Sequence, residues 1–290
     1  MNLNDLFVYS QYIAPQHLIS RFAGRIADCE TPRLKNALIA WFIEKYGVNM
    51  EEASRQSPEE FKHFNDFFTR ALKEGARPIN NTKKGLISPV DGAVSQLGEI
   101  NHGQVFQAKG QSFSVVELLG GDVERAEPFI GGNFATIYLS PKDYHRIHMP
   151  CKGTLREMVY IPGKLFSVNP VTAENVPRLF ARNERVAAIF DTEFGPMAMV
   201  LVGAMIVASI ETVWEGLVAP LKREIKTSQY GKETKEITLE KGDEMGRFKL
   251  GSTVVLTFPP NATEFIESLK AGSAIKMGES FGKINKVSVK

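Results

Sequence analysis

The sequence predicts an α+β fold, in which N-terminal amphipathic helices precede a mostly antiparallel β-sandwich or barrel-like core. Apolar residues recur at helical spacing near the N-terminus, whereas short β-rich runs broken by Gly, Pro and Asn fill the rest of the chain. The 290 residues are 43% hydrophobic and 23% charged, which is ordinary for a globular protein. We therefore expect a helical region over residues 1–75 and a β-rich domain over residues 76–290.

Two amphipathic helices are expected before residue 50. Pro15 can open the first, and Thr31 with Pro32 provides a cap and first turn for the second. Their apolar positions are Leu18, Ile19, Phe22, Ile26, Leu34, Leu38, Trp41, Phe42 and Tyr46. A helix with such a face either packs on the core of the domain or lies among lipid headgroups, where Trp and Tyr are favoured.

A third helix is expected from Ser57, because Ser57 and Glu60 have the spacing of a capping box. Residues 194–210 carry no charge, but Gly and Pro interrupt them, so two buried strands are expected there rather than a membrane span. The other expected elements are strands over 94–100, 134–139, 155–161, 186–190 and 197–201, short helices over 112–119 and 263–269, and a polar loop or exposed hairpin over 222–241.

Charge and cysteine content exclude several classes of protein. There are 35 Lys and Arg residues against 33 Asp and Glu, and the formal net charge of +2 is small for a protein that binds nucleic acid by neutralising phosphates. Cys29 and Cys151 are too few for a disulfide framework, and the N-terminus has no signal-peptide pattern. We therefore expect no nucleic-acid partner and a location on the reducing, cytosolic side.

Three short stretches carry candidate catalytic side chains. Asp91 lies in an Asp-Gly dipeptide, which alone is more typical of turn geometry than of catalysis. His145 and His148 lie three residues apart on a loop, where functional residues concentrate. Ser252 follows Gly251 within a strand-like run, where a glycine usually marks a bulge or a close backbone approach.

Two chemistries fit these residues. His145, His148 and Cys151 have the short spacing of metal ligands, but no second cluster supplies a fourth ligand, so no metal is expected. Asp91, His148 and Ser252 are the ingredients of an orienting acid, a base and a nucleophile. A serine hydrolase normally places its serine in a sharp turn such as Gly-x-Ser-x-Gly, whereas this serine directly follows a glycine within a strand. That setting favours attack on its own chain.

The sequence resembles the phosphatidylserine decarboxylases, a pyruvoyl-dependent family, over nearly its whole length. The resemblance is closest to bacterial members with a Leu-Gly-Ser-Thr cleavage motif, and one departure is Ala208, where the family more often has Gly. The matching motifs are Phe64-Asn65-Asp66-Phe67-Phe68-Thr69-Arg70, Pro89-Val90-Asp91-Gly92, residues 138–150, Phe166-Ser167-Val168-Asn169, Asn183-Glu184-Arg185, Phe190-Asp191-Thr192 and residues 246–253.

The resemblance implies that the β-rich domain is catalytic and first acts on itself. His148, oriented by Asp91, would remove the proton of Ser252, whose oxygen then attacks the carbonyl carbon of Gly251. Nucleophile and carbonyl belong to adjacent residues, so the reaction has the high effective concentration of an intramolecular attack. Elimination and hydrolysis of the resulting ester would release ammonia and leave a pyruvoyl group in place of the serine.

The cut implied by the resemblance yields a large fragment, 1–251, and a small fragment, 252–290, which would remain together as a heterodimer. The pyruvoyl ketone would form a Schiff base with the amine of phosphatidylserine and act as an electron sink for its decarboxylation to phosphatidylethanolamine, a step of phospholipid biosynthesis. The same resemblance assigns His145 to protonation after carbon dioxide leaves, and Tyr138 to the substrate pocket.

A lipid substrate also implies peripheral binding to the cytoplasmic side of a bacterial inner membrane. The helices within residues 15–46 would then lie at the interface, with Arg21 and Arg25 attracting anionic lipid. Two alternatives stay open at this point. One is a serine hydrolase that acts on an external ester, and the other is a non-enzymatic scaffold at the membrane surface.

Overall fold

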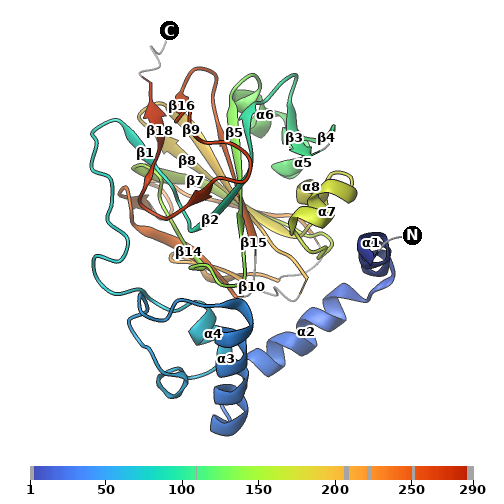
Figure 1. The fold of residues 1–290 in the computed structure, drawn as a ribbon. Coiled ribbons are helices and arrows are strands. Elements are labelled where there is room, and N and C mark those ends of the chain that lie inside the picture. The colour runs from blue at the N-terminus through green and yellow to red at the C-terminus, as the bar shows by residue number, and fades with distance from the viewer. Residues whose placement is uncertain (1–2, 109, 206–208, 221–223, 250–251, 286–290) are drawn as a thin grey trace.

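Strands form the body of the molecule, and helices α1 to α4 lie beneath and beside it (Figure 1). The computed structural model describes residues 3–108, 110–205, 209–220, 224–249 and 252–285. The helices are α1 (Leu3–Ile13), α2 (Gln16–Ala27), α3 (Pro32–Tyr46), α4 (Phe64–Phe68), α5 (Val115–Leu118), α6 (Val123–Ala126), α7 (Pro170–Asn175) and α8 (Leu179–Arg182), with 3-10 turns η1 (Pro58–Glu60) and η2 (Glu127–Phe129). The strands are β1 (Gly85–Ile87), β2 (Gly92–Glu99), β3 (Gln104–Ala108), β4 (Gln111–Ser114), β5 (Asn133–Leu139), β6 (Arg146–His148), β7 (Gly153–Ile161), β8 (Arg185–Thr192), β9 (Gly195–Val202), β10 (Ser209–Thr212), β11 (Gly216–Ala219), β12 (Lys226–Gln229), β13 (Thr238–Leu239), β14 (Glu244–Lys249), β15 (Ser252–Phe258), β16 (Thr263–Phe265), β17 (Ala274–Ile275) and β18 (Ser280–Ile284).

Antiparallel pairs build the sheets. The largest has the strand order β12-β7-β8-β9-β15-β5-β2-β17, and β13 also pairs with β7. A four-stranded sheet has the order β11-β10-β14-β6, a three-stranded sheet has the order β1-β18-β16, and β3 pairs with β4. The α+β class with antiparallel strands is therefore confirmed. Among the described strands the large sheet is open, so the core is layered and not a closed barrel.

Alternate residues of the central strand β15 enter two different hydrophobic clusters. Val254 and Leu256 belong to a cluster that includes Phe248 of β14. Val255 belongs to a second cluster, which includes Phe180 of α8. Because successive side chains of a strand point to opposite faces, the large sheet is a buried layer. The four-stranded and three-stranded sheets lie on one face, and helices α5 to α8 with the β3–β4 pair lie on the other.

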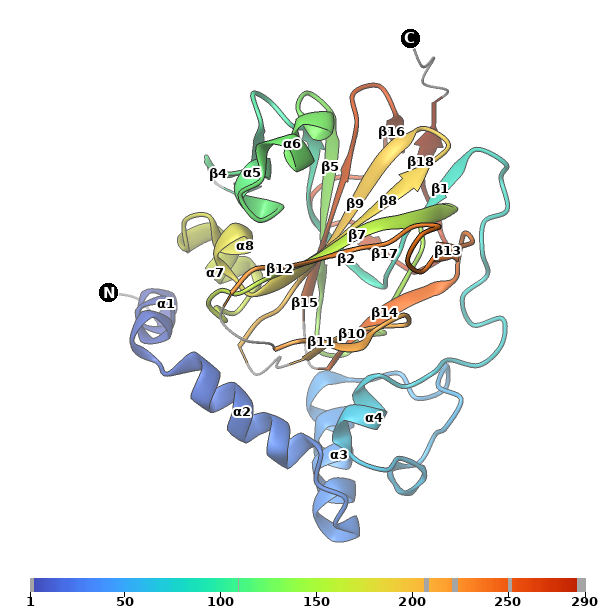
Figure 2. The same ribbon diagram turned by 180° about the vertical axis from the view of Figure 1, so that it is seen from behind.

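Helices α3 and α4 share a small hydrophobic cluster of their own. Phe42 of α3 meets Phe64 and Phe67 of α4 edge-on, with ring centroids 5.0 and 6.0 Å apart, and Ile39 is fully buried beside them. From there α2 runs along the outside of the molecule to α1, which contacts α7 (Figure 2). The first helices thus touch the β-rich body at few points.

The expected helices are confirmed in two cases and corrected in others. Those after Pro15 and at Thr31 are α2 and α3, whereas α1 was not expected. The third is wrong as a continuous helix, because Phe61 is extended between η1 and α4, which lets it join the aromatic cluster. Residues 263–269 are also not a helix. Thr263 and its neighbours form β16, since pairing with β18 outweighs the local pattern.

The strands expected over 94–100, 134–139, 155–161, 186–190 and 197–201 are confirmed as β2, β5, β7, β8 and β9, with small shifts of their ends. The helix expected over residues 112–119 starts as strand β4 and becomes helical only at α5, capped by Ser114.

The polar segment 222–241 contains β12 and β13, both paired with β7. Residues 194–210 include β9 and the start of β10, as expected for buried strands. No helix in the described part of the chain is long and apolar enough to cross a membrane.

Candidate active site

Strand register brings two of the sequence-predicted stretches to the same end of the large sheet. Thr253 of β15 pairs with Tyr138 of β5, which in turn pairs with Ala93 of β2. Ser252 lies one residue before Thr253 on β15, and Asp91 lies two residues before Ala93 of β2. Neighbouring strands are about 4.8 Å apart, so the two backbones lie within about 10 Å of each other across β5. The side chain of Ser252, and all of Gly251, lie outside the described residues.

Gly92 shows why a glycine follows Asp91. A Cβ atom at this position would collide with the carbonyl oxygen of Tyr138, because β2 and β5 approach closely there. The glycine is therefore required by the close approach of two strands and not by a turn, since Gly92 is the first residue of β2, and this approach holds Asp91 against the end of the sheet.

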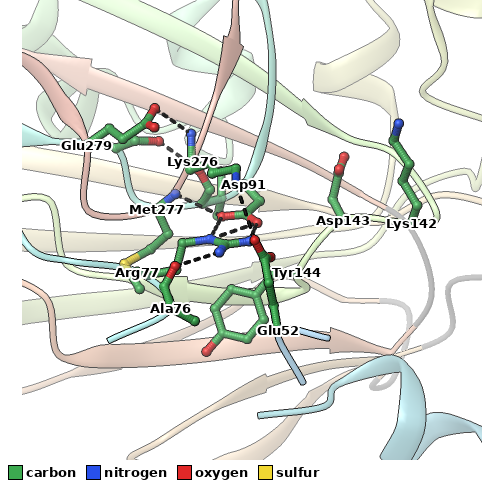
Figure 3. A network of polar contacts seen from close by, with 12 residues as sticks. Glu52, Ala76, Arg77, Asp91, Lys142, Asp143, Tyr144, Lys276, Met277 and Glu279 are labelled. Carbon is green, nitrogen blue, oxygen red and sulfur yellow. Dashed lines mark hydrogen bonds and ion pairs between the residues drawn. The ribbon is translucent and has the colours of Figure 1, made fainter. Parts of the chain in front are cut away.

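The carboxylate of Asp91 is held by Arg77 (Figure 3). The Nε atom of Arg77 donates to both carboxylate oxygens at 2.9 and 3.1 Å, and Nη2 donates at 2.5 Å. The backbone N–H of Met277 adds a bond of 2.9 Å to Oδ1. Both charged side chains are buried, with 6% and 8% of their area exposed. Asp91 is therefore fixed by a bidentate ion pair, a geometry that only arginine provides.

Glu52 and Lys276 extend this ion pair to other parts of the chain. The Nη2 atom of Arg77 also donates to Glu52 at 2.7 Å, and Lys276 lies 3.3 Å from the same carboxylate. Burial alone would lower the pKa of Arg77, but the bonds to Asp91 and Glu52 outweigh it and raise the pKa above its usual value. The network joins the N-terminal region, the head of β2 and the last strands.

His148 makes bonds through both ring nitrogens, and neither goes to Asp91. Nδ1 lies 2.8 Å from the carbonyl oxygen of Gly242, and Nε2 lies 3.1 Å from the hydroxyl of Tyr144. Burial lowers the pKa of His148 below its usual value. Asp91 was expected to orient His148, but no hydrogen bond joins the two side chains among the described residues, because the carbonyl oxygen of Gly242 accepts from Nδ1 in place of the carboxylate.

His145 is fully buried and neutral. Its Nδ1 donates to the carbonyl oxygen of Asp143 at 2.9 Å, and its ring packs against Phe68 with centroids 4.0 Å apart. Burial, the Asp143 carbonyl and the nearby charge of Arg70 together leave its pKa at about 3, with burial the largest cause. Nε2 is buried and has no hydrogen-bond partner among the described atoms. It is therefore an acceptor that is free to meet another group.

The two histidines lie at different distances from the expected cleavage position along β14. His148 pairs with Glu244 at the start of that strand. The N–H of Phe248, four residues further on, donates to the carbonyl oxygen of His145 at 3.1 Å. Four residues of strand span about 13 Å. His145 is thus beside the end of β14 that leads toward Ser252, and His148 is beside the other end.

Tyr138 and the cavity near Asp91 complete the surroundings. The Tyr138 side chain is half-buried against the cluster under α5 to α8, and burial followed by the charge of Asp143 raises its pKa. A cavity of about 210 Å³ lies over Asp91. Its lining carries positive charge on Arg70 and Lys142 and negative charge on Asp91 and Asp143. Such a lining suits a polar headgroup that carries both an ammonium and anionic groups.

The metal alternative finds no support in the position of Cys151. Its thiol is buried and contacts the sulfur of Met197 at 3.9 Å, and burial raises its pKa to about 12. A metal-ligating cysteine needs the opposite, an easily formed thiolate. In the part of the chain that the structure describes, no three His, Cys, Asp or Glu side chains are grouped to hold a metal ion.

Sequence reasoning missed the residues that hold the predicted ones. Tyr144 and Gly242 hold His148, while Arg77 holds Asp91 and Glu52 in turn holds Arg77. Tyr144 stands inside the matching motif over residues 138–150, and that placement was an available signal. Arg77 and Glu52 lie in polar stretches without periodicity, so nothing local marked them.

Comparisons with known proteins agree with the motifs. A family model described as phosphatidylserine decarboxylase matches residues 64–283, and one described as PSD matches residues 6–47. A Hahella chejuensis protein named phosphatidylserine decarboxylase proenzyme is 61% identical over 98% of this chain and 96% of its own length. Proteins of that name from Pseudomonas fluorescens strain Pf0-1 and Pseudomonas putida are 62% and 64% identical, over 97% and 94% of this chain and 98% and 96% of their own lengths. The chain therefore belongs to the phosphatidylserine decarboxylase family.

Proposed function

We propose that this chain is a proenzyme that cuts itself between Gly251 and Ser252 and then decarboxylates phosphatidylserine to phosphatidylethanolamine. The observation that carries the proposal is its identity of more than 60% to proteins named phosphatidylserine decarboxylase proenzyme, over nearly the full length of both chains. The geometry of the strand ends supplies physical support for each step.

A cut before Ser252 fits the topology. The strands on either side of the cleavage position lie in different sheets, since β14 is held by β6 and β10, and β15 is held by β5 and β9. Each strand therefore keeps hydrogen-bonded neighbours on both edges after the peptide bond is broken. The new N-terminus at residue 252 would stay in place against Leu139.

The small fragment would remain bound to the large one. Fragment 252–290 contains β15 to β18, and β15 is the fully buried centre of the large sheet. The pairings of β18 with β1 and of β17 with β2 also join the two fragments. A heterodimer of fragments 1–251 and 252–290 follows from these contacts.

In the self-cleavage step, His148 is the proposed base and Ser252 the proposed nucleophile. The neutral imidazole has its Nδ1 proton fixed on the Gly242 carbonyl, which leaves Nε2 to take the serine proton. The serine oxygen then forms a bond to the carbonyl carbon of Gly251, the bond from that carbon to the serine nitrogen breaks, and the nitrogen takes the proton back from His148 to leave as an amine. Asp91 contributes its negative charge, which favours the protonated form of His148 as the proton arrives.

In the decarboxylation step, the pyruvoyl group formed from Ser252 supplies an electron sink for the bond to the departing carboxylate. His145 is the proposed proton carrier. Its buried Nε2 has an unshared pair, so it must take up a proton in the substrate complex before it can deliver one. Tyr138 is a proposed wall of the substrate pocket.

Membrane attachment through the first helices is part of the proposal. Ile13, Leu18 and Phe22 are 86%, 67% and 65% exposed on α1 and α2, and Arg21 and Arg25 are exposed on α2 as well. Apolar side chains with neighbouring cations suit an interface with anionic lipid. We infer peripheral binding to the cytoplasmic side of the inner membrane.

A denaturing gel and a carbon dioxide assay test the proposal together. Purified protein should run as two fragments, and it should release carbon dioxide from phosphatidylserine. An intact chain that hydrolyses esters would favour a serine hydrolase instead. An intact chain with neither activity would favour a scaffold.

A further inference from the structure

Tyr144 occupies the nitrogen of His148 that can act as a base. Nδ1 of His148 faces the carbonyl oxygen of Gly242 at 2.8 Å, and since a carbonyl only accepts, Nδ1 carries the proton. In the neutral ring Nε2 then holds the unshared pair. The hydroxyl of Tyr144, 3.1 Å away, must be the donor of that hydrogen bond.

Tyr144 keeps its proton throughout the neutral range. Its side chain is 6% exposed, and burial raises its pKa to about 12. The ring centroids of Tyr144 and His148 lie 5.7 Å apart with an interplanar angle of 31°, and both residues are buried, so the surrounding packing holds the hydroxyl near the imidazole. The hydrogen bond to His148 is therefore a standing feature of this arrangement.

We propose that Tyr144 is a positioning residue that holds His148 at rest, and that self-cleavage begins when the Tyr144 hydroxyl releases Nε2. This inference rests on the proposed role of His148 as the base for Ser252. A base whose unshared pair is already engaged cannot accept a proton until that bond breaks.

Three charged groups act on His148 from the elements around it. Glu244 of β14 and Asp91 at the head of β2 favour its protonated form, and Arg146 on its own strand opposes it. None of them is changed by Tyr144→Phe, which removes a single hydroxyl. The donated bond stabilises the neutral imidazole, so its loss should raise the pKa of His148.

The test follows cleavage of full-length precursor made by pulsed cell-free translation, with fragments 1–251 and 252–290 separated on denaturing gels. Tyr144→Phe should cut about three- to tenfold faster than the parent, the effect of freeing one hydrogen bond between neutral groups. The acid side of its rate profile should move to higher pH. The matched control is Tyr160→Phe, which removes another buried hydroxyl, bonded to Glu184 at 2.8 Å, and should leave both rate and profile unchanged.

Slower or unchanged cleavage in Tyr144→Phe, or an unmoved acid limb, would overturn the inference. Acceleration is informative, because damage to a fold rarely speeds a reaction. A His148→Ala precursor separates this outcome from failure of the proposed function. If that variant still cuts, His148 is not the base, so its proposed role and the inference on Tyr144 both fall while self-cleavage itself stands. If His148→Ala is uncut and Tyr144→Phe is slow, His148 remains the base and only the inference on Tyr144 falls.

Discussion

The strand-end site and the N-terminal helices are held in opposite ways. Val254 and Leu256, just after the expected cleavage position, are fully buried in a strand paired on both edges. Helix α2 is anchored at a few points, such as the Gln16 side chain, which accepts from the N–H of Leu165, while Leu18 faces solvent. Strand pairing fixes the first region on both edges, whereas much of the apolar face of α2 is exposed to solvent.

This difference indicates that the chemistry and the proposed membrane attachment are separable. The site depends on contacts within the β-rich body, and loss of one contact there should change processing without changing vesicle binding. The proposed attachment depends on the exposed apolar side chains of α1 and α2, so changes to them should weaken vesicle binding without changing processing.

The largest effect is expected from Ser252→Ala. Without the hydroxyl there is no nucleophile, so no fragments and no carbon dioxide should be detected, while flotation with vesicles stays normal. Thr253→Val is the control, because the buried Oγ1 of Thr253 has no hydrogen-bond partner among the described atoms and cleavage should persist. Fragments from the alanine variant would contradict the assignment.

His145→Ala should separate the two reactions. We expect a normally cut protein whose decarboxylation rate falls on the order of 100-fold or more, as is typical for loss of a proton-transfer group. The rate is measured with a soluble short-chain phosphatidylserine, so that membrane binding does not enter. A chain that stays uncut would move His145 into the processing step.

Arg77→Gln should weaken the site without touching the helices. Breaking a buried ion pair leaves the charge of Asp91 uncompensated, and the free energy of unfolding in urea should fall by about 3 kcal/mol. The Ser252→Ala background keeps every sample as one chain. Adding Asp91→Asn should recover part of the loss, whereas strictly additive losses would show that the pair is not coupled.

Leu18→Ser combined with Phe22→Ser should weaken binding to vesicles of anionic lipid by about tenfold, since less apolar area enters the interface. Cleavage should not change. Val123→Ser is the matched control, because Val123 is 64% exposed on α6, away from α2 (Figure 1). Equal loss in the control, or altered cleavage in the double variant, would break the separation of the two regions.

At neutral pH the smallest effect on stability is expected from His145, whose contribution to stability is lost only as the pH falls. Its pKa is about 3 in the folded chain and about 6.5 when unfolded. The unfolded state therefore binds the extra proton, and stability is lost as pH falls from about 6.5 toward 3, by at most about 1.4 kcal/mol per pH unit. His145→Gln in the Ser252→Ala background should flatten this part of the curve. An unchanged slope would show that other groups cause it.

Pattern reasoning predicted those elements whose fold is set by their own residues. The helices after Pro15 and at Thr31 and the buried strands of the large sheet were foreseen, because periodicity and caps are local signals. The helix expected over 263–269 was wrong because β16 forms only when β18, some twenty residues later, pairs with it. Local sequence does not carry that information.

The hydrogen-bond partners of the candidate site residues could not be predicted from the sequence. Asp91 and His148 stand out by residue type and motif, but their partners Arg77 and Gly242 come from distant segments and are chosen by packing. A backbone carbonyl in particular has no sequence signal, since every residue has one. For this reason the triad expected from residue types assigned Asp91 to orient His148, whereas the structure has the backbone carbonyl of Gly242 in contact with Nδ1 of His148.

Intact mass of freshly purified, active protein distinguishes a self-cut chain that carries a pyruvoyl group from an uncut one. We expect two polypeptides, and the smaller should begin at position 252 and weigh less than its amino-acid sequence requires by one molecule of ammonia. A single polypeptide of full length that still consumes lipid, or a short piece with an ordinary serine at its start, would contradict it.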